Sequence, residues 1–114
     1  MPCGHTGPVL VVNRFRVPSD AAGGFRDDLE QARQALAARP GHLESRIGRN
    51  LDDPELWVLT STWESVGAYR RALSAYDVKL HAVPTLSRAV DEPSAYEWAE
   101  PGRDLNDAAP RSLG

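Results

Sequence analysis

Cysteine is almost absent from this sequence of 114 residues, and long apolar runs are absent altogether. The single cysteine, Cys3, excludes an internal disulfide, and no structural zinc site can be built from it. The longest apolar stretch, Val9 to Val12, is far shorter than the roughly 20 residues of a membrane-spanning helix. The first residues also lack the basic-then-apolar order of a signal peptide. These absences predict a cytoplasmic protein with no membrane partner.

An excess of positive charge is lacking as well. Thirteen Lys and Arg stand against sixteen Asp and Glu, a formal net charge of -3 at pH 7. This balance disfavours nucleic acid as a partner, and we expect none. No segment repeats along the chain, which excludes a solenoid. The length, with 41% hydrophobic and 25% charged residues, is typical of one globular domain.

Several catalytic signatures are also missing. The sequence holds no glycine pattern that suits a phosphate, no Gly-x-Ser-x-Gly, and no Cys/His pairing for covalent catalysis. No cluster of His, Cys and carboxylates has the spacing of metal ligands. We therefore expect no metal site.

The composition of the two ends differs from that of the middle. Residues 1–7 and 100–114 are rich in Gly and Pro or in polar residues and show no periodicity. We predict a flexible leader at 1–7, a single domain at 8–99, and a polar C-terminal tail at 100–114.

The first half of the domain predicts a strand followed by a helix. Residues 8–17 are rich in β-branched side chains and end at Pro18. Ser19 or Asp20 is the expected helix N-cap, and Gly23-Gly24 weaken the first turn, so we predict a helix that starts near Phe25. Pro40-Gly41 should stop it. The inward stripe of this helix consists of Phe25, Leu29, Ala32 and Leu36.

The second half predicts a hairpin, a helical region and a last strand. Residues 42–49 and 55–63 read as two strands joined by a polar turn. Ser65 is the expected cap of a second helix, and a short helical piece through His81 should end before Pro84. We expect the last strand within 85–98, at an edge or interrupted, because Pro93 cannot donate to a ladder. The inward stripe of the second helix is predicted to be Ala68, Tyr69, Ala72, Leu73 and Tyr76.

This order of elements, β-α-β-β-α-β, predicts an α+β fold of the ferredoxin-like, split βαβ class. Both helices should cover one face of a four-stranded antiparallel sheet. The first and third strands carry apolar side chains on both faces, so the second face also needs a cover. A homodimer in which the two sheets pack together would provide it.

Three residues on the predicted inward faces could carry chemistry. Asn13 shares the parity of the buried positions of its strand, where an amide either ties down main chain or water or binds a substrate oxygen. Trp63 ends the third strand, and Tyr69 lies on the inward stripe of the second helix. Core packing is the alternative role of both aromatic side chains.

His81 is the one histidine in a predicted helix. A neutral imidazole there could ligate a metal or accept a proton. A surface position at a helix end is the alternative.

The stretch from Val9 to His81 resembles the antibiotic biosynthesis monooxygenase family. The resemblance rests on VNRFRVP at the end of the first strand, on Pro40-Gly41, on Trp63-Glu64-Ser65, and on the following Ala68-Tyr69. It covers about three-quarters of the chain and implies a dimeric α/β barrel of ferredoxin-like topology.

Two branches of that family match different residues. In the branch that oxidises polycyclic phenols with O2 and neither metal nor flavin, the pocket uses a Trp and a Tyr that correspond to Trp63 and Tyr69. Leu59 occupies the place of that branch's polar amide. In the heme-degrading branch, Asn13 and His81 match two of the three site residues, and Ala72 replaces the indole that distorts the porphyrin.

The resemblance implies a cofactor-independent monooxygenase that oxidises a small electron-rich aromatic, such as an anthrone or dihydroquinone, with O2. The predicted catalytic residues are Asn13, Trp63, Tyr69 and His81. The predicted substrate-binding residues are Phe15, Trp57, Leu59 and Ala72. One alternative is a heme-binding or heme-degrading protein with His81 as the axial ligand. Another is a dimeric ligand-binding module without catalysis.

Overall fold

The computed structural model describes residues 7–105. The predicted leader, apart from Gly7, and the end of the predicted tail lie outside the described residues. The elements are β1 (Val9–Arg16), a 3-10 turn η1 (Ser19–Ala21), α1 (Ala22–Ala37), β2 (His42–Arg49), β3 (Leu56–Trp63), α2 (Val66–Ser74), α3 (Tyr76–His81), α4 (Val83–Leu86) and β4 (Ala95–Glu97).

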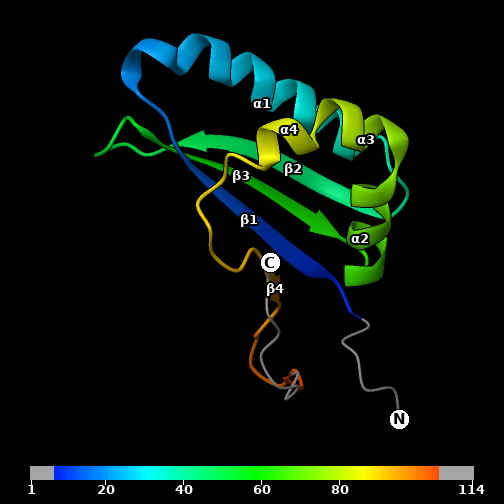
Figure 1. Ribbon diagram of the computed structural model, residues 1–114. Helices are drawn as coiled ribbons and strands as arrows, with labels where there is room; N and C mark the ends of the chain where they lie inside the picture. Colours follow the sequence, from blue (N-terminus) through cyan, green and yellow to red (C-terminus); the bar gives the residue numbers. More distant parts are fainter. Residues whose placement is uncertain (1–6, 106–114) are drawn as a thin grey trace.

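The four strands form one antiparallel sheet in the order β2-β3-β1-β4. The register places Asn13 opposite Leu59 on β3, and Val9 opposite Trp63. The helices lie on one side of the sheet, with α1 running along it and α3 and α4 beside α1 (Figure 1). This arrangement confirms the predicted ferredoxin-like α+β fold.

The core lies between the helices and the helix-facing side chains of the two central strands. On β3 the buried positions alternate strictly with half-buried ones, as the period of two in a strand requires. The predicted inward stripe of α1 is buried along its full length. The buried positions of β3 are Trp57, Leu59, Ser61 and Trp63.

The start of α1 differs from the prediction. The helix begins at Ala22 rather than near Phe25, and its N-cap is Ala21, without a side-chain cap. Ser19 instead opens the 3-10 turn. Gly23 lies in the first turn with open space around it. Burial of the inward stripe further along α1 offsets the conformational entropy that this glycine loses in the helix.

A glycine at the end of the α1–β2 connection is required by both backbone and space. Gly41 has φ +90°, a conformation that L side chains rarely adopt. A Cβ atom there would lie 2.5 Å from the Cβ of Ala68. The main chain at Gly41 therefore packs directly against α2.

The second helical region is broken where one continuous stripe was expected. Ser65 caps α2 as predicted, accepting a hydrogen bond from the Ala68 amide at 3.1 Å. Ala75 is extended and separates α2 from α3, so Tyr76 starts a new helix and is 76% exposed. Its predicted inward position was therefore wrong. Pro84 lies in the first turn of α4, a position that proline tolerates.

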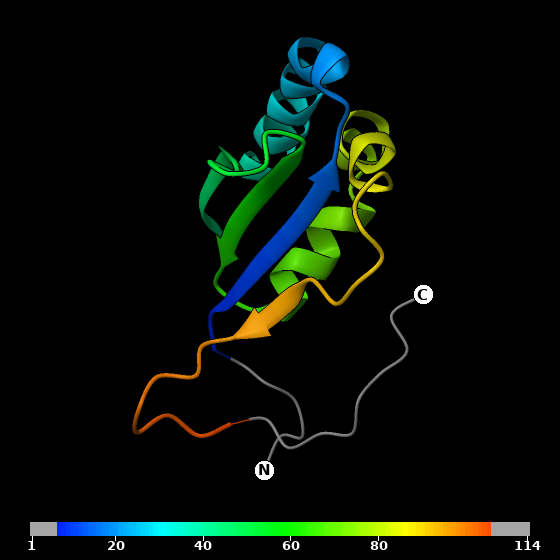
Figure 2. The same cartoon turned by 90° about the vertical axis from the view of Figure 1, so that its left-hand side faces the viewer.

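The last strand is short and lies at the edge of the sheet. β4 pairs with the first half of β1 over three residues (Figure 2). Pro93 precedes it, and the chain before β4 leaves the ladder. The prediction of an interrupted edge strand is confirmed.

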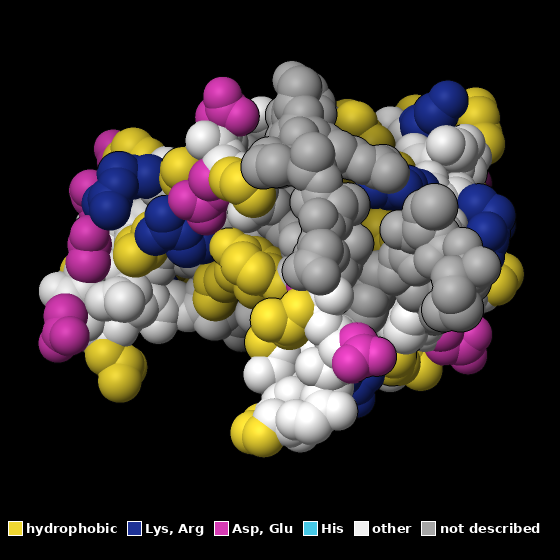
Figure 3. Space-filling view, turned by 90° about the horizontal axis from the view of Figure 1, so that it is seen from below, with side chains coloured by type: hydrophobic (Ala, Val, Ile, Leu, Met, Phe, Trp, Pro, Cys, Tyr) yellow, Lys and Arg dark blue, Asp and Glu magenta, His cyan; other side chains and the backbone are white. Residues whose placement is uncertain are grey.

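The face of the sheet away from the helices carries half-buried apolar and polar side chains. Hydrophobic side chains gather there among charged ones (Figure 3). The register gives this face the half-buried residues Leu10, Val12, Leu56, Val58, Thr60 and Thr62, and the exposed residues Arg14, Arg16 and Tyr96. Within residues 7–105, no helix is long and apolar enough to cross a membrane.

Candidate active site

A cavity of about 340 Å³ lies at the open edge of β1, and we call it the edge cavity. It exists because the chain between α4 and β4 arches away from the strand instead of pairing with it. Its lining consists of Val12, Asn13, Leu86, Ser87, Ala89, Val90, Asp91, Glu92 and Ser94.

The arch of residues 90–94 is fastened to β1 at both ends. The Val90 amide donates to the Arg14 carbonyl, and the Val12 amide donates to the Ser94 carbonyl, each at 2.7 Å. The Arg14 guanidinium also donates two hydrogen bonds to the Glu92 carboxylate, at 2.6 and 2.7 Å. This pairing lowers the pKa of Glu92, so the carboxylate stays ionised at neutral pH.

Asn13 lies between these two attachment points. Its side chain is half-buried and lines the edge cavity. Within the described part of the chain, no protein group hydrogen-bonds its amide. The sequence left two roles open for Asn13. The structure shows no hydrogen bond from its side chain to the main chain of residues 7–105. The amide is therefore free to donate to, or accept from, a bound molecule.

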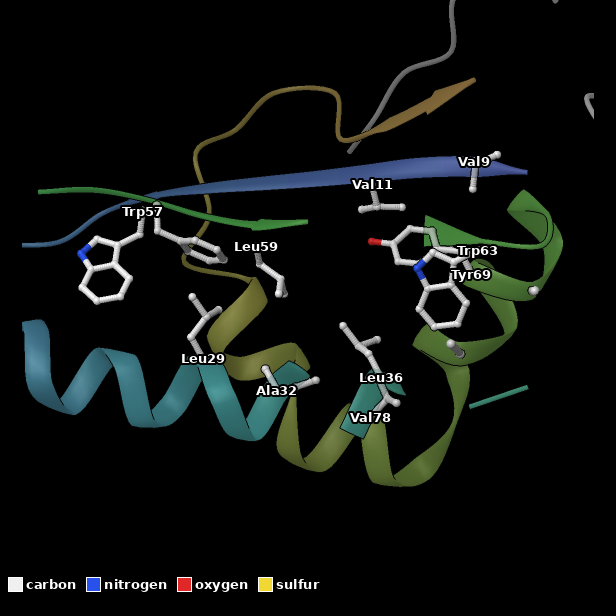
Figure 4. Packing of buried hydrophobic residues seen from close by; sticks show 14 of the residues in the cluster. Val9, Val11, Leu29, Ala32, Leu36, Trp57, Leu59, Trp63, Tyr69 and Val78 are labelled. Carbon is white, nitrogen blue, oxygen red and sulfur yellow. The ribbon is translucent and has the colours of Figure 1, made fainter. Parts of the chain in front are cut away.

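Tyr69 approaches the same place from inside the core. Its ring is 8% exposed, and its hydroxyl points from the α2 end toward the middle of the core (Figure 4). The Ser94 side chain, which lines the edge cavity, lies close enough to the Tyr69 hydroxyl to act on its pKa, whereas Tyr69 itself is not part of the lining. Burial raises the pKa of Tyr69 above its usual 10.0, and the Ser94 side chain opposes this only in part. Tyr69 is thus a protonated donor at neutral pH.

Trp63 packs behind Tyr69, with 5.5 Å between the ring centroids. Its indole N–H donates to the buried Ser61 hydroxyl at 2.9 Å. The ring of His42 meets Trp63 edge-on at 5.2 Å, and burial together with Arg33 lowers the pKa of His42. We call Trp63, Tyr69, Ser61 and His42 the Trp63 cluster. It supports the Tyr69 ring, but Trp63 itself does not line the edge cavity.

The four predicted substrate-binding residues all lie in the packed core. Phe15 and Trp57 flank Phe25 at centroid distances of 5.2 and 5.6 Å, and we call these three the Trp57 cluster. Leu59 and Ala72 are also fully buried. None of the four lines the edge cavity. Trp57 and Trp63 lie at opposite ends of the core (Figure 4). Their six-residue separation on β3 corresponds to about 20 Å at the rise of a strand.

His81 lies away from Asn13. It is exposed on α3 and lines a groove of about 390 Å³ between α1 and α3. Its Nδ1 atom is 3.1 Å from the Gln31 amide nitrogen. Since Asn13 and His81 line different cavities, the structure does not bring together the pair that a heme site would use. No metal site is formed by His, Cys, Asp or Glu in residues 7–105.

Sequence reasoning missed the residues that the arch contributes to the edge cavity. Asp91, Glu92 and Ser94 lie in a stretch without hydrophobic periodicity, and Ser87 directly follows α4. The available signal was Pro93, which interrupts the last strand. An interrupted edge strand leaves a gap beside its neighbour, and side chains of the gap then face one another.

Comparison with known proteins places this fold in a family. A model of the antibiotic biosynthesis monooxygenase family matches residues 8–81. A 42.8 kDa protein in the whiE locus of Streptomyces coelicolor is 31% identical over 91 residues. That alignment covers 80% of this chain, but the chain spans only 23% of the length of the relative.

Solved structures share the fold. SnoaB of Streptomyces nogalater, described as a cofactor-independent oxygenase, superposes with a TM-score of 0.71 at 22% identity, covering 86% of this chain and 99% of SnoaB. Rv0793 of Mycobacterium tuberculosis gives a TM-score of 0.67 at 17% identity, covering 85% of this chain and all of Rv0793 (100%). The fold and the family match agree, and this chain belongs to the antibiotic biosynthesis monooxygenase family.

Proposed function

We propose that the protein is a cofactor-independent monooxygenase that oxidises a small electron-rich aromatic at the edge cavity. The observation that carries the proposal is the side-chain amide of Asn13, which lines the edge cavity beside Ser94 and has no hydrogen-bond partner among residues 7–105. The family membership and the fold shared with SnoaB support the reaction class.

In this proposal the substrate supplies the electrons. A phenol or anthrone loses a proton to solvent water and becomes an electron-rich anion, which reduces O2 and, after taking a proton back, forms a carbon-bound hydroperoxide. Cleavage of the O–O bond leaves one oxygen atom on the ring as a quinone carbonyl, and the other leaves as water. The protein orients the substrate, shields it from solvent and stabilises the developing charge.

The proposed roles follow from position. The Asn13 amide donates to the substrate oxygen, where negative charge develops. Tyr69 is kept protonated by burial, and because Ser94 donates toward its oxygen, the Tyr69 hydroxyl hydrogen stays available as a donor. Trp63 holds the Tyr69 ring in place. Phe15, Trp57, Leu59 and Ala72 support the core behind the cavity rather than touching the ligand, and His81 has no role here.

Oxygen consumption tests the proposal. A metal-free preparation is incubated with 1,8-dihydroxyanthrone, and O2 uptake and formation of the anthraquinone are followed together. We expect one O2 consumed per quinone above the spontaneous rate, with about a hundredfold loss of kcat in Asn13→Ala because an oxyanion donor is removed. Tyr76→Phe removes an exposed hydroxyl and serves as the control. Binding without turnover would overturn the proposal in favour of a ligand-binding module.

We further propose a homodimer formed through the helix-free face of the sheet. Family members are typically dimeric, and this face carries half-buried apolar side chains such as Leu10 and Val58. Burying that face in a partner would remove apolar surface from water. Sedimentation should give twice the 12.5 kDa mass of the chain, and Val58→Asp should give the monomer. A wild-type monomer at micromolar concentration would contradict the dimer.

A further inference from the structure

We infer that the edge cavity selects an uncharged aromatic ligand, with hydroxyl or carbonyl groups, over the same ring system bearing a carboxylate. The inference rests on the proposed function and narrows its substrate class.

The charged residues in the lining are both acidic. They are Asp91 and Glu92, and among residues 7–105 no Lys, Arg or His lines the cavity. The other polar groups are the amide of Asn13 and the hydroxyls of Ser87 and Ser94. Ser87 already donates its hydroxyl hydrogen to the Pro84 carbonyl at 2.8 Å, so it meets a ligand as an acceptor.

The two arginines nearest in sequence to the lining are occupied. Arg14 is held by Glu92 in a two-point ion pair. Arg88 turns to α1, where it lies 4.9 Å from the centroid of the Phe25 ring and 3.7 Å from the Asp28 carboxylate. Within the part of the chain that the structure describes, a ligand carboxylate would therefore find no free guanidinium at the cavity.

Asp91 is the uncompensated charge of the lining. It is exposed, and it has no ion-pair partner among residues 7–105. A second carboxylate brought beside it meets like-charge repulsion and loses hydration without gaining a cation. Neutral phenol and carbonyl oxygens instead match the donors that are present. Because Asp91 is exposed, salt should weaken this discrimination.

Two stable quinones measure this charge discrimination in binding alone, because they are already oxidised and are not turned over. The probes are 1,8-dihydroxyanthraquinone and its 3-carboxylic acid, titrated against the full chain by isothermal calorimetry at low and high salt. We expect the acid to bind about tenfold more weakly at low salt, and about threefold more weakly at high salt. Asp91→Asn should reduce the low-salt difference to about threefold. Asp27→Asn, the same charge change on an exposed position of α1, should leave it at tenfold.

The outcomes separate this inference from the proposed function. Equal binding of the two quinones, or the same change in both Asp variants, overturns the inference alone, because an aromatic ligand still binds. Failure of both quinones to bind overturns the inference together with the cavity as an aromatic site. Tenfold discrimination that depends on Asp91 supports the inference even if no oxygen is consumed.

Discussion

The two aromatic clusters of the core lie at opposite ends of β3 and differ in what surrounds them. In the Trp57 cluster, rings pack against rings, and the arginines Arg49 and Arg88 lie over Trp57 and Phe25. In the Trp63 cluster, rings pack against hydroxyls and an imidazole, and Tyr69 reaches the edge cavity through Ser94.

The indole nitrogens show the same difference. The Trp57 Nε1 atom is buried, and within the described residues it has no hydrogen-bond partner. The Trp63 Nε1 atom donates to Ser61. Burial alone therefore does not distinguish a structural aromatic residue from one that supports a site. The polar contacts of the aromatic side chain make this distinction, because a buried hydrogen-bond network fixes the position of the ring.

Truncating the centre of the Trp57 cluster should have the largest effect on stability. Phe25→Ala removes a ring that contacts both Phe15 and Trp57, and we expect a loss of about 3 to 5 kcal/mol in the free energy of unfolding. Urea denaturation measures it. Affinity for 1,8-dihydroxyanthraquinone at a temperature where the variant is folded should stay within twofold, and a tenfold loss would contradict the separation of the two clusters.

Two glycines, one near each aromatic cluster, test how much the main-chain conformation contributes to stability. Gly41→Ala, beside the Trp63 cluster, forces a side chain into φ +90° and against Ala68, and should cost about 3 kcal/mol. Gly23→Ala, in the helix that carries Phe25, has open space and should stabilise by about 0.5 to 1 kcal/mol. Thermal unfolding of both variants measures the difference, and a stable Gly41 variant would contradict the close packing against α2.

Removing one indole N–H at each end compares the hydrogen bonding directly. Trp63→Phe leaves the buried Ser61 hydroxyl without its donor, and we expect it to cost about 1 kcal/mol more than Trp57→Phe, whose N–H has no partner. Chemical denaturation of the pair gives this difference. Equal costs would show that packing, not the hydrogen bond, dominates at Trp63.

The smallest effect concerns pH. The pKa of Tyr69 is raised in the folded state, so its contribution to stability is complete below pH 10 and is lost as pH rises from 10 through the folded-state pKa. Tyr69→Phe should lose less stability in this alkaline range than the wild type. Ser94→Ala should raise the pKa of Tyr69 further, because the Ser94 bond lowers it, and Ser94→Thr should restore it.

Ultraviolet titration of the tyrosinate band measures this pKa. Tyr76 and Tyr96 are exposed, and the spectrum of Tyr69→Phe identifies their share of the signal. An unchanged titration in Ser94→Ala would show that the Tyr69–Ser94 contact does not affect the pKa of Tyr69.

Much of the fold could be predicted because its signals are periodic and local. The strict alternation of β3, the α1 stripe, Pro40-Gly41 and the Ser65 cap each act within a few residues. The errors occurred where tertiary contacts override local preference. Buried side chains further along α1 hold its first turn in spite of Gly23, and the extended Ala75 turns Tyr76 outward.

The candidate site was predicted only in part. Asn13 and Tyr69 could be selected because each places a polar group at an inward position. Ser94 and Asp91 could not, because their position depends on how an interrupted strand arches around β1. The separation of Trp57 from Trp63 follows from strand length alone, so the predicted substrate-binding residue Trp57 and the predicted catalytic residue Trp63 could not contact the same small ligand.

The most direct test of the edge cavity as the ligand site is a ¹⁵N NMR titration with 1,8-dihydroxyanthraquinone. We predict that the side-chain amide signals of Asn13 and the backbone amides of residues 86–94, apart from Pro93, shift together, while the indole N–H signal of Trp57 stays in place. A shift of the Trp57 signal with Asn13 unmoved would place the ligand at the other end of the core and contradict the account.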